Sequence, residues 1–142
     1  MLRNLDPILC PDLLYVLRAM GHGDGIVIAD ANFPAESLGP RCIRADGSDA
    51  SVVLNAVLSV MPLDTYTQTP ALCMQVVGDA NAVPEAVADF QAIINATADA
   101  PCDLMLLERF AFYERAKSAF AVVQTGERRL YGNIILTKGV FT

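Results

Sequence analysis

The chain has 142 residues, the length of one ordinary domain, and two separate hydrophobic cores would be cramped in it. Apolar residues make up 54% of the sequence and the mean hydropathy is +0.39. These values exclude a disordered chain and are high for a small monomer, so we expect part of the apolar surface to lie in subunit contacts. The net charge of −6 argues against nucleic acid or an anionic membrane as a partner, because both are bound by a cationic face.

No stretch approaches the roughly 18–20 unbroken apolar residues of a membrane span. Asp6 and Asp12 interrupt the N-terminal segment, and no apolar stretch ends in a small-residue cleavage site, so the cytoplasm is the predicted location. His22 is the one histidine, which excludes a His-rich metal site. No CxxC pair occurs, and we interpret the cysteines as small apolar side chains of a reducing compartment rather than as metal or redox groups. They are Cys10, Cys42, Cys73 and Cys102.

Helix-like and strand-like segments alternate, which predicts an α/β fold in a single domain over residues 1–142. The first expected helix, residues 11–20, has proline in its first turn, an apolar face at helical spacing and Gly21 as its stop. A short buried strand at 25–29 and a loop at 30–40 follow. The remaining expected elements are a strand at 41–45, a helix at 48–61, a strand at 71–77, a helix at 84–97, a strand at 104–107, a helix at 109–118, and strands at 120–124 and 130–136.

The connection between the last two expected strands is short and contains Thr125 and Gly126. We therefore expect these two strands to pair as an antiparallel hairpin, which makes the sheet mixed rather than purely parallel. The third expected helix has apolar residues at helical spacing. Its predicted inner side consists of Val83, Val87, Phe90 and Ile94.

His22 stands between two glycines, just after the first expected helix and before the first strand. The glycines leave the imidazole unshielded. Imidazole is the side chain whose ordinary pKa lies near neutrality, so it can both donate and accept a proton. The pattern leaves two interpretations open: an acid–base catalyst, or a surface-turn histidine of no consequence.

Asp30 directly follows the expected strand 25–29. Ligands of α/β sheets bind at the carboxyl ends of strands, where a carboxylate can hold sugar hydroxyls or orient an imidazole. The alternative is an aspartate that merely opens the following loop through an Asx turn.

Two further segments place hydrogen-bonding side chains beside aromatic ones. In the fourth expected helix, Arg109 and Tyr113 share a face, and both can donate to a polyol. At the last strand, Tyr131 and Asn133 project to one side, and Gly132 allows the backbone to approach a ligand. The alternatives are an ordinary amphipathic helix and an ordinary strand edge. No phosphate-binding loop and no serine nucleophile elbow occur in the sequence.

These segments together resemble the family of L-fucose mutarotases and D-ribose pyranases. The stretches RFAFYERA and DANFP are similar to the fucose branch rather than to the ribose branch. The similar stretches lie in order along nearly the whole chain: LLYVLRAMGHGD (13–24), IVIADANFP (26–34), IRADG (43–47), PLDTY (62–66), ERFAFYERAK (108–117), AFAVVQTGE (119–127) and YGNIIL (131–136).

The resemblance implies a three-layer α/β/α fold with one mixed sheet. It also implies a ring-shaped homo-oligomer, a decamer, with active sites at subunit boundaries. In the resemblance His22 takes the place of the proton-transferring histidine, and Tyr113 that of a second acid–base group. The substrate-binding places fall on Asp30, Asp64, Met74, Arg109, Tyr131 and Asn133.

The activity implied is an isomerase that interconverts the α and β anomers of L-fucose without a cofactor or a metal. The anomeric hydroxyl loses a proton, the ring oxygen gains one, and the ring opens to an aldehyde that closes onto the opposite face. Positioning of the short-lived aldehyde matters as much as acidity. Two alternatives stay open: a D-ribose pyranase that interconverts pyranose and furanose forms, and a non-catalytic sugar-binding protein.

Overall fold

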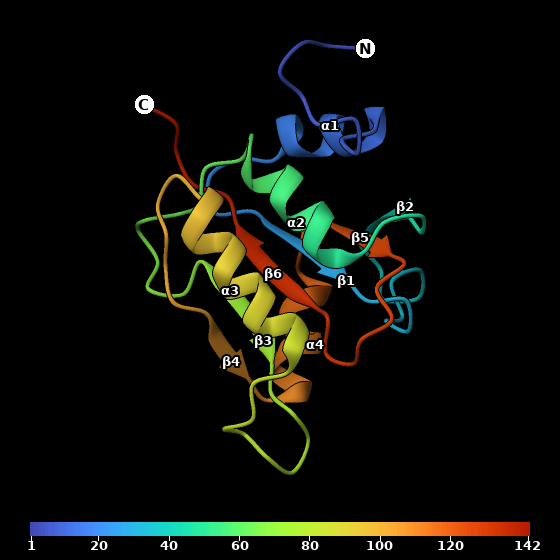
Figure 1. The fold of residues 1–142 in the computed structure, drawn as a ribbon, viewed down its shortest axis with the longest axis vertical. Coiled ribbons are helices and arrows are strands. Elements are labelled where there is room, and N and C mark those ends of the chain that lie inside the picture. Colours follow the sequence, from blue (N-terminus) through green and yellow to red (C-terminus); the bar gives the residue numbers. More distant parts are fainter.

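A computed structural model describes all 142 residues and shows one six-stranded sheet in the order β2-β5-β1-β6-β3-β4 (Figure 1). The helices are α1 (Pro11–Ala19), α2 (Ala50–Leu58), α3 (Glu85–Thr97) and α4 (Arg109–Lys117). The strands are β1 (Gly25–Ala29), β2 (Arg41–Ala45), β3 (Ala71–Met74), β4 (Met105–Leu107), β5 (Ala121–Thr125) and β6 (Ile134–Thr137).

One strand, β6, runs against all the others. It pairs antiparallel with β1 and with β3, whereas β1 with β5, β2 with β5 and β3 with β4 are parallel pairs. The carboxyl ends of the parallel strands and the start of β6 therefore lie at one edge of the sheet, which we call the carboxyl edge. The starts of the parallel strands and the end of β6 lie at the opposite edge, the amino edge.

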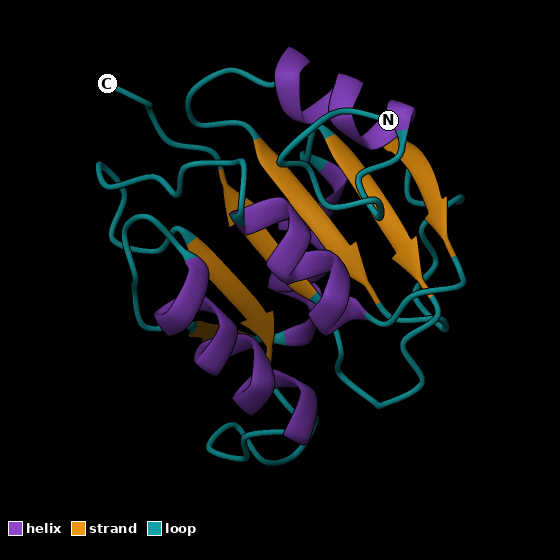
Figure 2. Ribbon diagram, turned by 45° about the horizontal axis from the view of Figure 1, so that its top comes forward, coloured by secondary structure: helices purple, strands orange, loops and turns teal.

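Two apolar cores lie on the two faces of the sheet. Helices α1, α2 and α3 cover one face and share a core of 26 buried residues. Helix α4 covers the other face alone, in a core of 10 buried residues that includes the fully buried Phe112. Figure 2 shows the sheet between these two helical layers. The predicted three-layer α/β/α fold with a mixed sheet is confirmed.

Local signals in the sequence explain where the helices begin. Pro11 occupies the first turn of α1, where its missing N–H removes no hydrogen bond. The Asp49 carboxylate accepts a hydrogen bond from the Val52 amide at 2.8 Å, so α2 begins at Ala50, later than expected. The Glu108 carboxylate caps α4 by accepting from the amides of Phe110 and Ala111. These caps determine the residues at which α2 and α4 begin, which the apolar periodicity of the sequence does not determine by itself.

The predicted hairpin of the last two strands is wrong. β1 lies between β5 and β6 and pairs with both. The connecting segment, residues 126–133, crosses the end of β1, where the Glu127 carbonyl accepts from the Ala31 amide and the Thr125 hydroxyl donates to the Ala29 carbonyl. The crossing spans two strand spacings, about 10 Å, which a segment of this length covers easily. The short connection therefore does not require the two strands to be neighbours.

Val83 also departs from its expected place. It precedes Pro84, the N-cap of α3, so it lies outside the helix and is 63% exposed. The other three residues of the predicted inner side, Val87, Phe90 and Ile94, are buried. The expected strand 71–77 is also shorter, because the chain leaves the sheet after Met74 and turns at Gly78, whose φ is +83°.

The packing of α4 depends on Phe112. We expect Phe112→Ala to lower the free energy of unfolding by about 3–5 kcal/mol, because it removes a fully buried ring and leaves a cavity. Phe110→Ala is the matched control on the same helix, since that ring is 67% exposed, and it should change stability by no more than about 0.5 kcal/mol. Denaturant unfolding measures both. Equal effects of the two substitutions would contradict this packing.

Candidate active site

A buried pair of polar side chains, Asp30 and Asn133, lies at the carboxyl edge beside the end of β1. Asn133 Nδ2 donates to Asp30 Oδ2 at 2.7 Å, and the Asp30 amide donates to Asn133 Oδ1 at 2.8 Å. The Asn32 amide donates to Asp30 Oδ1 at 3.0 Å. Burial raises the pKa of Asp30 above its usual range, although these hydrogen bonds act in the opposite direction. The reciprocal bonds fix both side chains in one orientation.

The main-chain end of β1 is held from β5. The Gln124 side chain donates to the Asp30 carbonyl, and the Thr125 hydroxyl donates to the Ala29 carbonyl at 2.7 Å. Both donors are buried. Asp30 is thus fixed through its backbone by β5 and through its side chain by Asn133, in the turn that precedes β6.

Aromatic and sulfur side chains extend this edge on the α4 face of the sheet. Met74, at the end of β3, is buried in the same core as Phe33. The Tyr113 ring stacks on the Phe33 ring, with centroids 5.4 Å apart. Tyr131 packs against this core, and its hydroxyl accepts from the Val77 amide at 3.1 Å. The carboxyl edge therefore combines an apolar wall with phenol, carboxylate and amide groups.

Arg109 opens α4 directly after β4. Together with Glu108 and residues 75–80, it lines a cavity of about 330 Å³. This volume lies in the lower part of the range found for small-molecule sites. The guanidinium lies over the Phe110 ring, 5.1 Å from its centroid, and forms no ion pair. Its donors are free for a ligand at the carboxyl edge.

The second polar group lies at the amino edge. His22 Nε2 is 2.9 Å from Asp64 Oδ1, and Asp64 also accepts from the amides of Tyr66 at 3.2 Å and Thr67 at 3.0 Å. Burial by itself would raise the pKa of Asp64, but these three hydrogen bonds together lower it below its usual range. An ionised Asp64 only accepts hydrogen bonds, so Nε2 carries the proton and Nδ1 is the unpaired ring nitrogen.

The loop that carries His22 is fixed from the end of β6. The Lys138 carbonyl accepts from the Gly23 amide at 2.9 Å, and the Lys138 ammonium donates to the carbonyls of Leu17 and Met20 at the end of α1. The His22 side chain is 47% exposed, whereas that of Asp64 is 5% exposed. A rigid support therefore presents a solvent-accessible imidazole.

The structure brings the expected site residues together in two groups rather than one. The pair His22 and Asp64 lies before β1 and β3, at the amino edge. The other six, the carboxyl-edge group, comprise Asp30, Met74, Arg109, Tyr113, Tyr131 and Asn133. β1 separates the groups, and its five residues span about 17 Å. Within one chain, no monosaccharide contacts both His22 and Asp30.

Sequence reasoning assigned Gly132 a role that the structure does not support. A side-chain carbon at position 132 would lie 2.6 Å from Glu127 Cγ and 3.5 Å from Asp30 Cβ, so glycine makes room for protein rather than for a ligand. Residues 131–133 also precede β6 instead of opening it, and Tyr131 has a φ of +61°. This turn, not a strand, presents Tyr131 and Asn133.

Two aromatic neighbours of the site were not singled out from the sequence. Tyr66 lies against the His22 ring, with centroids 5.2 Å apart, and Phe33 supports Tyr113. Both lie in loops, where no periodicity indicates an inward face. The available signal was their position, two residues after Asp64 and three after Asp30.

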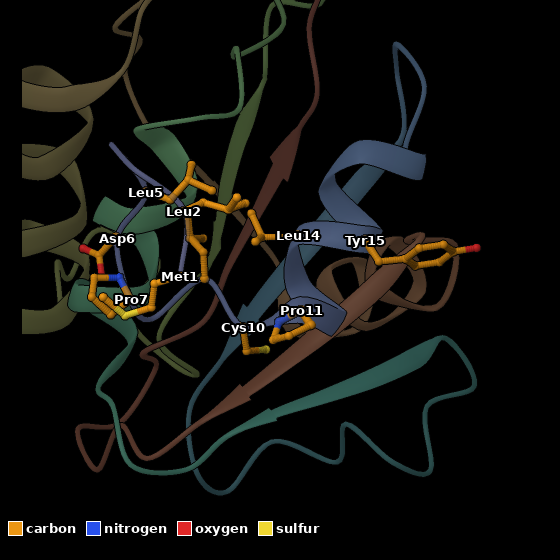
Figure 3. Close-up of a pocket in the computed structure, with 10 residues that line it drawn as sticks. Met1, Leu2, Leu5, Asp6, Pro7, Cys10, Pro11, Leu14 and Tyr15 are labelled. Atoms are coloured by element: carbon orange, nitrogen blue, oxygen red, sulfur yellow. The ribbon is translucent and has the colours of Figure 1, made fainter.

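A larger hollow lies away from these residues. It has a volume of about 750 Å³ and is lined by the N-terminal segment and α1, mainly by apolar side chains (Figure 3). Asp6 is its one carboxylate, and Tyr15 is 62% exposed at its rim. The hollow is therefore mainly an apolar surface, and it contains none of the expected site residues.

The chain holds four free thiols and no group of three or more His, Cys, Asp or Glu side chains that could bind a metal ion. Cys73 is buried and the other three are half-buried. None of the four helices combines the length and apolarity required to cross a membrane.

The fold and the site define a class: three-layer α/β proteins with polar groups at both ends of a central strand. The chain belongs to the RbsD / FucU transport protein family, whose model matches residues 3–141. It is 50% identical to fucose mutarotase of Mus musculus, an alignment that covers 97% of this chain and 94% of that protein.

Solved structures agree with this assignment. The crystal structure of the fucose mutarotase in complex with L-fucose from Streptococcus pneumoniae has a TM-score of 0.92 and 40% identity, over 99% of this chain and all of that chain. Bacillus subtilis RbsD complexed with D-ribose has a TM-score of 0.76 at 22% identity, with both chains covered in full. That second likeness shows the fold alone.

The lowered pKa of Asp64 makes its contribution to stability depend on pH. Its stabilisation is complete above the ordinary carboxyl value of 3.8 and is lost as the pH falls through the lower folded value. We expect Asp64→Asn to be less stable than the wild type at pH 7, with the difference shrinking below pH 3.8. Thermal unfolding between pH 7 and about pH 2.5 measures this. A difference that grows below pH 3.8 would contradict the lowered pKa of Asp64.

Proposed function

We propose that the protein is an L-fucose mutarotase, an isomerase that interconverts the α and β anomers of this sugar. The observation that carries the proposal is the near-full-length similarity to a fucose mutarotase, at 50% identity. The geometry supports it, because an imidazole ordered by a carboxylate and a fixed Asp30–Asn133 pair are the groups that proton transfer and hydroxyl binding need.

His22 is the proposed proton carrier. Its Nε2–H donates to Asp64, which fixes the ring and leaves Nδ1 to exchange a proton with the sugar. One transfer takes the proton from the anomeric hydroxyl and the other protonates the ring oxygen. Tyr113, whose phenol can donate and accept, is the proposed second acid–base group. Ring opening and closure break and re-form one C–O bond with proton transfer and no net oxidation or reduction, so the proposed chemistry requires no redox cofactor.

The carboxyl-edge group is proposed to bind the sugar. Asp30 and Asn133 face each other at 2.7 Å and offer acceptors and a donor for hydroxyl groups. Arg109 and Tyr131 add further polar contacts, while Met74 forms part of the apolar wall against which an exocyclic methyl can pack. Asp64 is proposed to bind substrate from the amino edge as well as to orient His22.

We propose that a complete site forms between two copies of the chain, the amino edge of one meeting the carboxyl edge of the next. The separation of His22 and Asp30 by β1 supports this arrangement. A contact between two different surfaces repeats from subunit to subunit and gives a closed ring when the rotation between subunits closes. The proposed ring is a decamer, as the family resemblance implies. The apolar hollow near the N-terminus is consistent with further subunit contacts.

The proposed location is the cytoplasm, where free thiols such as the four of this chain persist.

L-fucose should be the better substrate when compared with D-ribose. We expect a preference of roughly 10- to 200-fold, the discrimination that an apolar wall gives for one methyl group. Saturation-difference NMR of anomer exchange, at matched sugar concentrations with and without protein, measures it. Faster exchange of D-ribose would favour the ribose pyranase alternative, and unchanged exchange of both sugars would favour a non-catalytic sugar-binding protein.

Separate defects at the two edges should complement each other. His22→Ala alone should lower exchange by about 10²–10⁴-fold, the usual contribution of one acid–base group. Asn133→Ala should also lower activity, because it removes the partner of Asp30. Co-refolding both variants at equal ratio should restore about a quarter of wild-type activity, since random mixing gives that share of intact sites at a two-subunit boundary. Light scattering checks assembly, and absence of any restoration would contradict the shared site.

A further inference from the structure

The turn that carries Tyr131 and Asn133 is held by an ion pair between the buried carboxylate of Glu127 and the half-buried Arg129. The Glu127 side chain is 4% exposed, and Arg129 contacts it through one edge of its guanidinium. Arg129 Nε lies 3.0 Å from Glu127 Oε1, and Nη2 lies 2.9 Å from Oε2. The Arg129 amide adds a third bond to Oε1 at 2.9 Å. Such a two-pronged pair fixes direction as well as distance.

The pair connects this turn to the helical layer on the opposite face of the sheet from α4. Arg129 Nη2 donates to the Ser51 hydroxyl of α2 at 3.2 Å, and Nη1 donates to the Asp89 carboxylate of α3. The Glu127 carbonyl accepts from the Ala31 amide at 2.8 Å, on the loop that follows Asp30. One ionic group thus links two helices, the end of β1 and the turn of residues 126–133.

Within the turn of residues 126–133, the Glu127 side chain also packs against Gly132. Its Cγ fills the space that a side chain at position 132 would need, between Tyr131 and Asn133, and the same position is close to Asp30 Cβ. Around the Asp30 carboxyl, the 30–40 loop contributes the amides of Asn32 and Phe33, and the 126–133 turn contributes Asn133 and Glu127. Gln124 of β5 donates to the Asp30 backbone carbonyl rather than to its carboxyl, and Glu127 is the titratable neighbour of that carboxyl.

We propose that Glu127 and Arg129 are positioning residues of the sugar site: Arg129 fixes and neutralises Glu127, which supports the turn and sets the electrostatic surroundings of Asp30. The hydrogen bonds from Arg129 lower the pKa of Glu127, so its carboxylate is charged at neutral pH. The negative charge of Glu127 in turn acts to raise the pKa of Asp30. The positive charge of Arg129, in contact with Glu127, reduces this effect on the pKa of Asp30. The role in sugar binding rests on the proposed function, whereas the electrostatic coupling to Asp30 does not.

The coupling predicts shifts of opposite sign for the two partners. Glu127→Gln keeps the shape and removes the charge, so the pKa of Asp30 falls. Arg129→Met leaves the Glu127 charge without its partner, so the pKa of Asp30 rises. Each shift should be about 0.5 pH unit, the size expected for one partly screened neighbouring charge. If Glu127 and Arg129 had only a structural role, the two substitutions would not shift the pKa of Asp30 in opposite directions.

Infrared titration of the carboxylic C=O stretch, assigned to Asp30 by the Asp30→Asn variant, measures these shifts on the full-length assembled protein. Arg128→Met is the matched control, because Arg128 is exposed, lies next to Arg129 and forms no ion pair. It should leave the titration of Asp30 unchanged. The double variant Glu127→Gln/Arg129→Met should titrate near the wild-type value, and it tests the coupling even if Arg129→Met alone fails to fold. Shifts in the same direction, or no shift, overturn the proposal.

A second measurement joins the coupling to sugar binding. Calorimetric titration with L-fucose across acidic pH should show the loss of affinity moving to lower pH in Glu127→Gln and to higher pH in Arg129→Met. If the pH at which affinity for L-fucose is lost shifts together with the pKa of Asp30, the positioning role is supported. If that pH does not change with the pKa of Asp30, the positioning role is overturned. If the wild type does not bind L-fucose, the proposed function fails, while the infrared titration still decides the coupling.

Discussion

The position of β1 between β5 and β6 is the constraint on which the rest of the structure depends. Its residues Ile26–Ala29 are fully buried, and the strand pairs parallel on one side and antiparallel on the other. Because both neighbours carry polar groups at their ends, the end of β1 receives hydrogen bonds from Gln124 and Thr125 on one side and from Asn133 on the other. These hydrogen bonds from both sides hold Asp30 in one position.

The same strand orientation determines what each edge can do. A parallel sheet gathers the carboxyl ends of its strands at one edge, where loops are free to vary. Here the single reversed strand, β6, adds its start to that edge and its end to the other. The reversal supplies Asn133 to Asp30 and, at the far end, Lys138 to the loop of His22. One strand thus supports both groups of polar residues.

Much of the fold could be predicted from the sequence, because apolar spacing and breakers report directly on helices and strands. The residues of β1 and β2 agree with the expected ranges, and α1, α3 and α4 differ by about a residue at their ends. Strand order could not be predicted in this way. Short connections favour neighbours, but the buried bonds of Thr125 and Gln124 to the end of β1 place β5 beside it, and those bonds have no sequence periodicity.

The sequence proposes the candidate site residues one by one, and their roles stay predictions. The structure adds that they lie in two groups at opposite edges of the sheet. The expected strand 25–29 already lies between His22 and Asp30, but which other candidate residues join each of them depends on strand order and orientation, which the spacing does not indicate. The supporting residues were missed for a similar reason. Glu127 and Arg129 look like solvated charges in a turn, whereas the Glu127 side chain is 4% exposed and Gly132 packs close to it.

The separation of His22 from Asp30 by the length of β1 has a consequence for how activity depends on protein concentration. If each reaction centre needs two chains, an isolated subunit has none, and specific activity falls on dilution below the dissociation constant of the subunit contact. Inactive chains in a mixed population then disable centres in their neighbours as well as their own. A change on the surface far from the sugar, if it weakens the contact, lowers turnover without altering any group that touches the substrate.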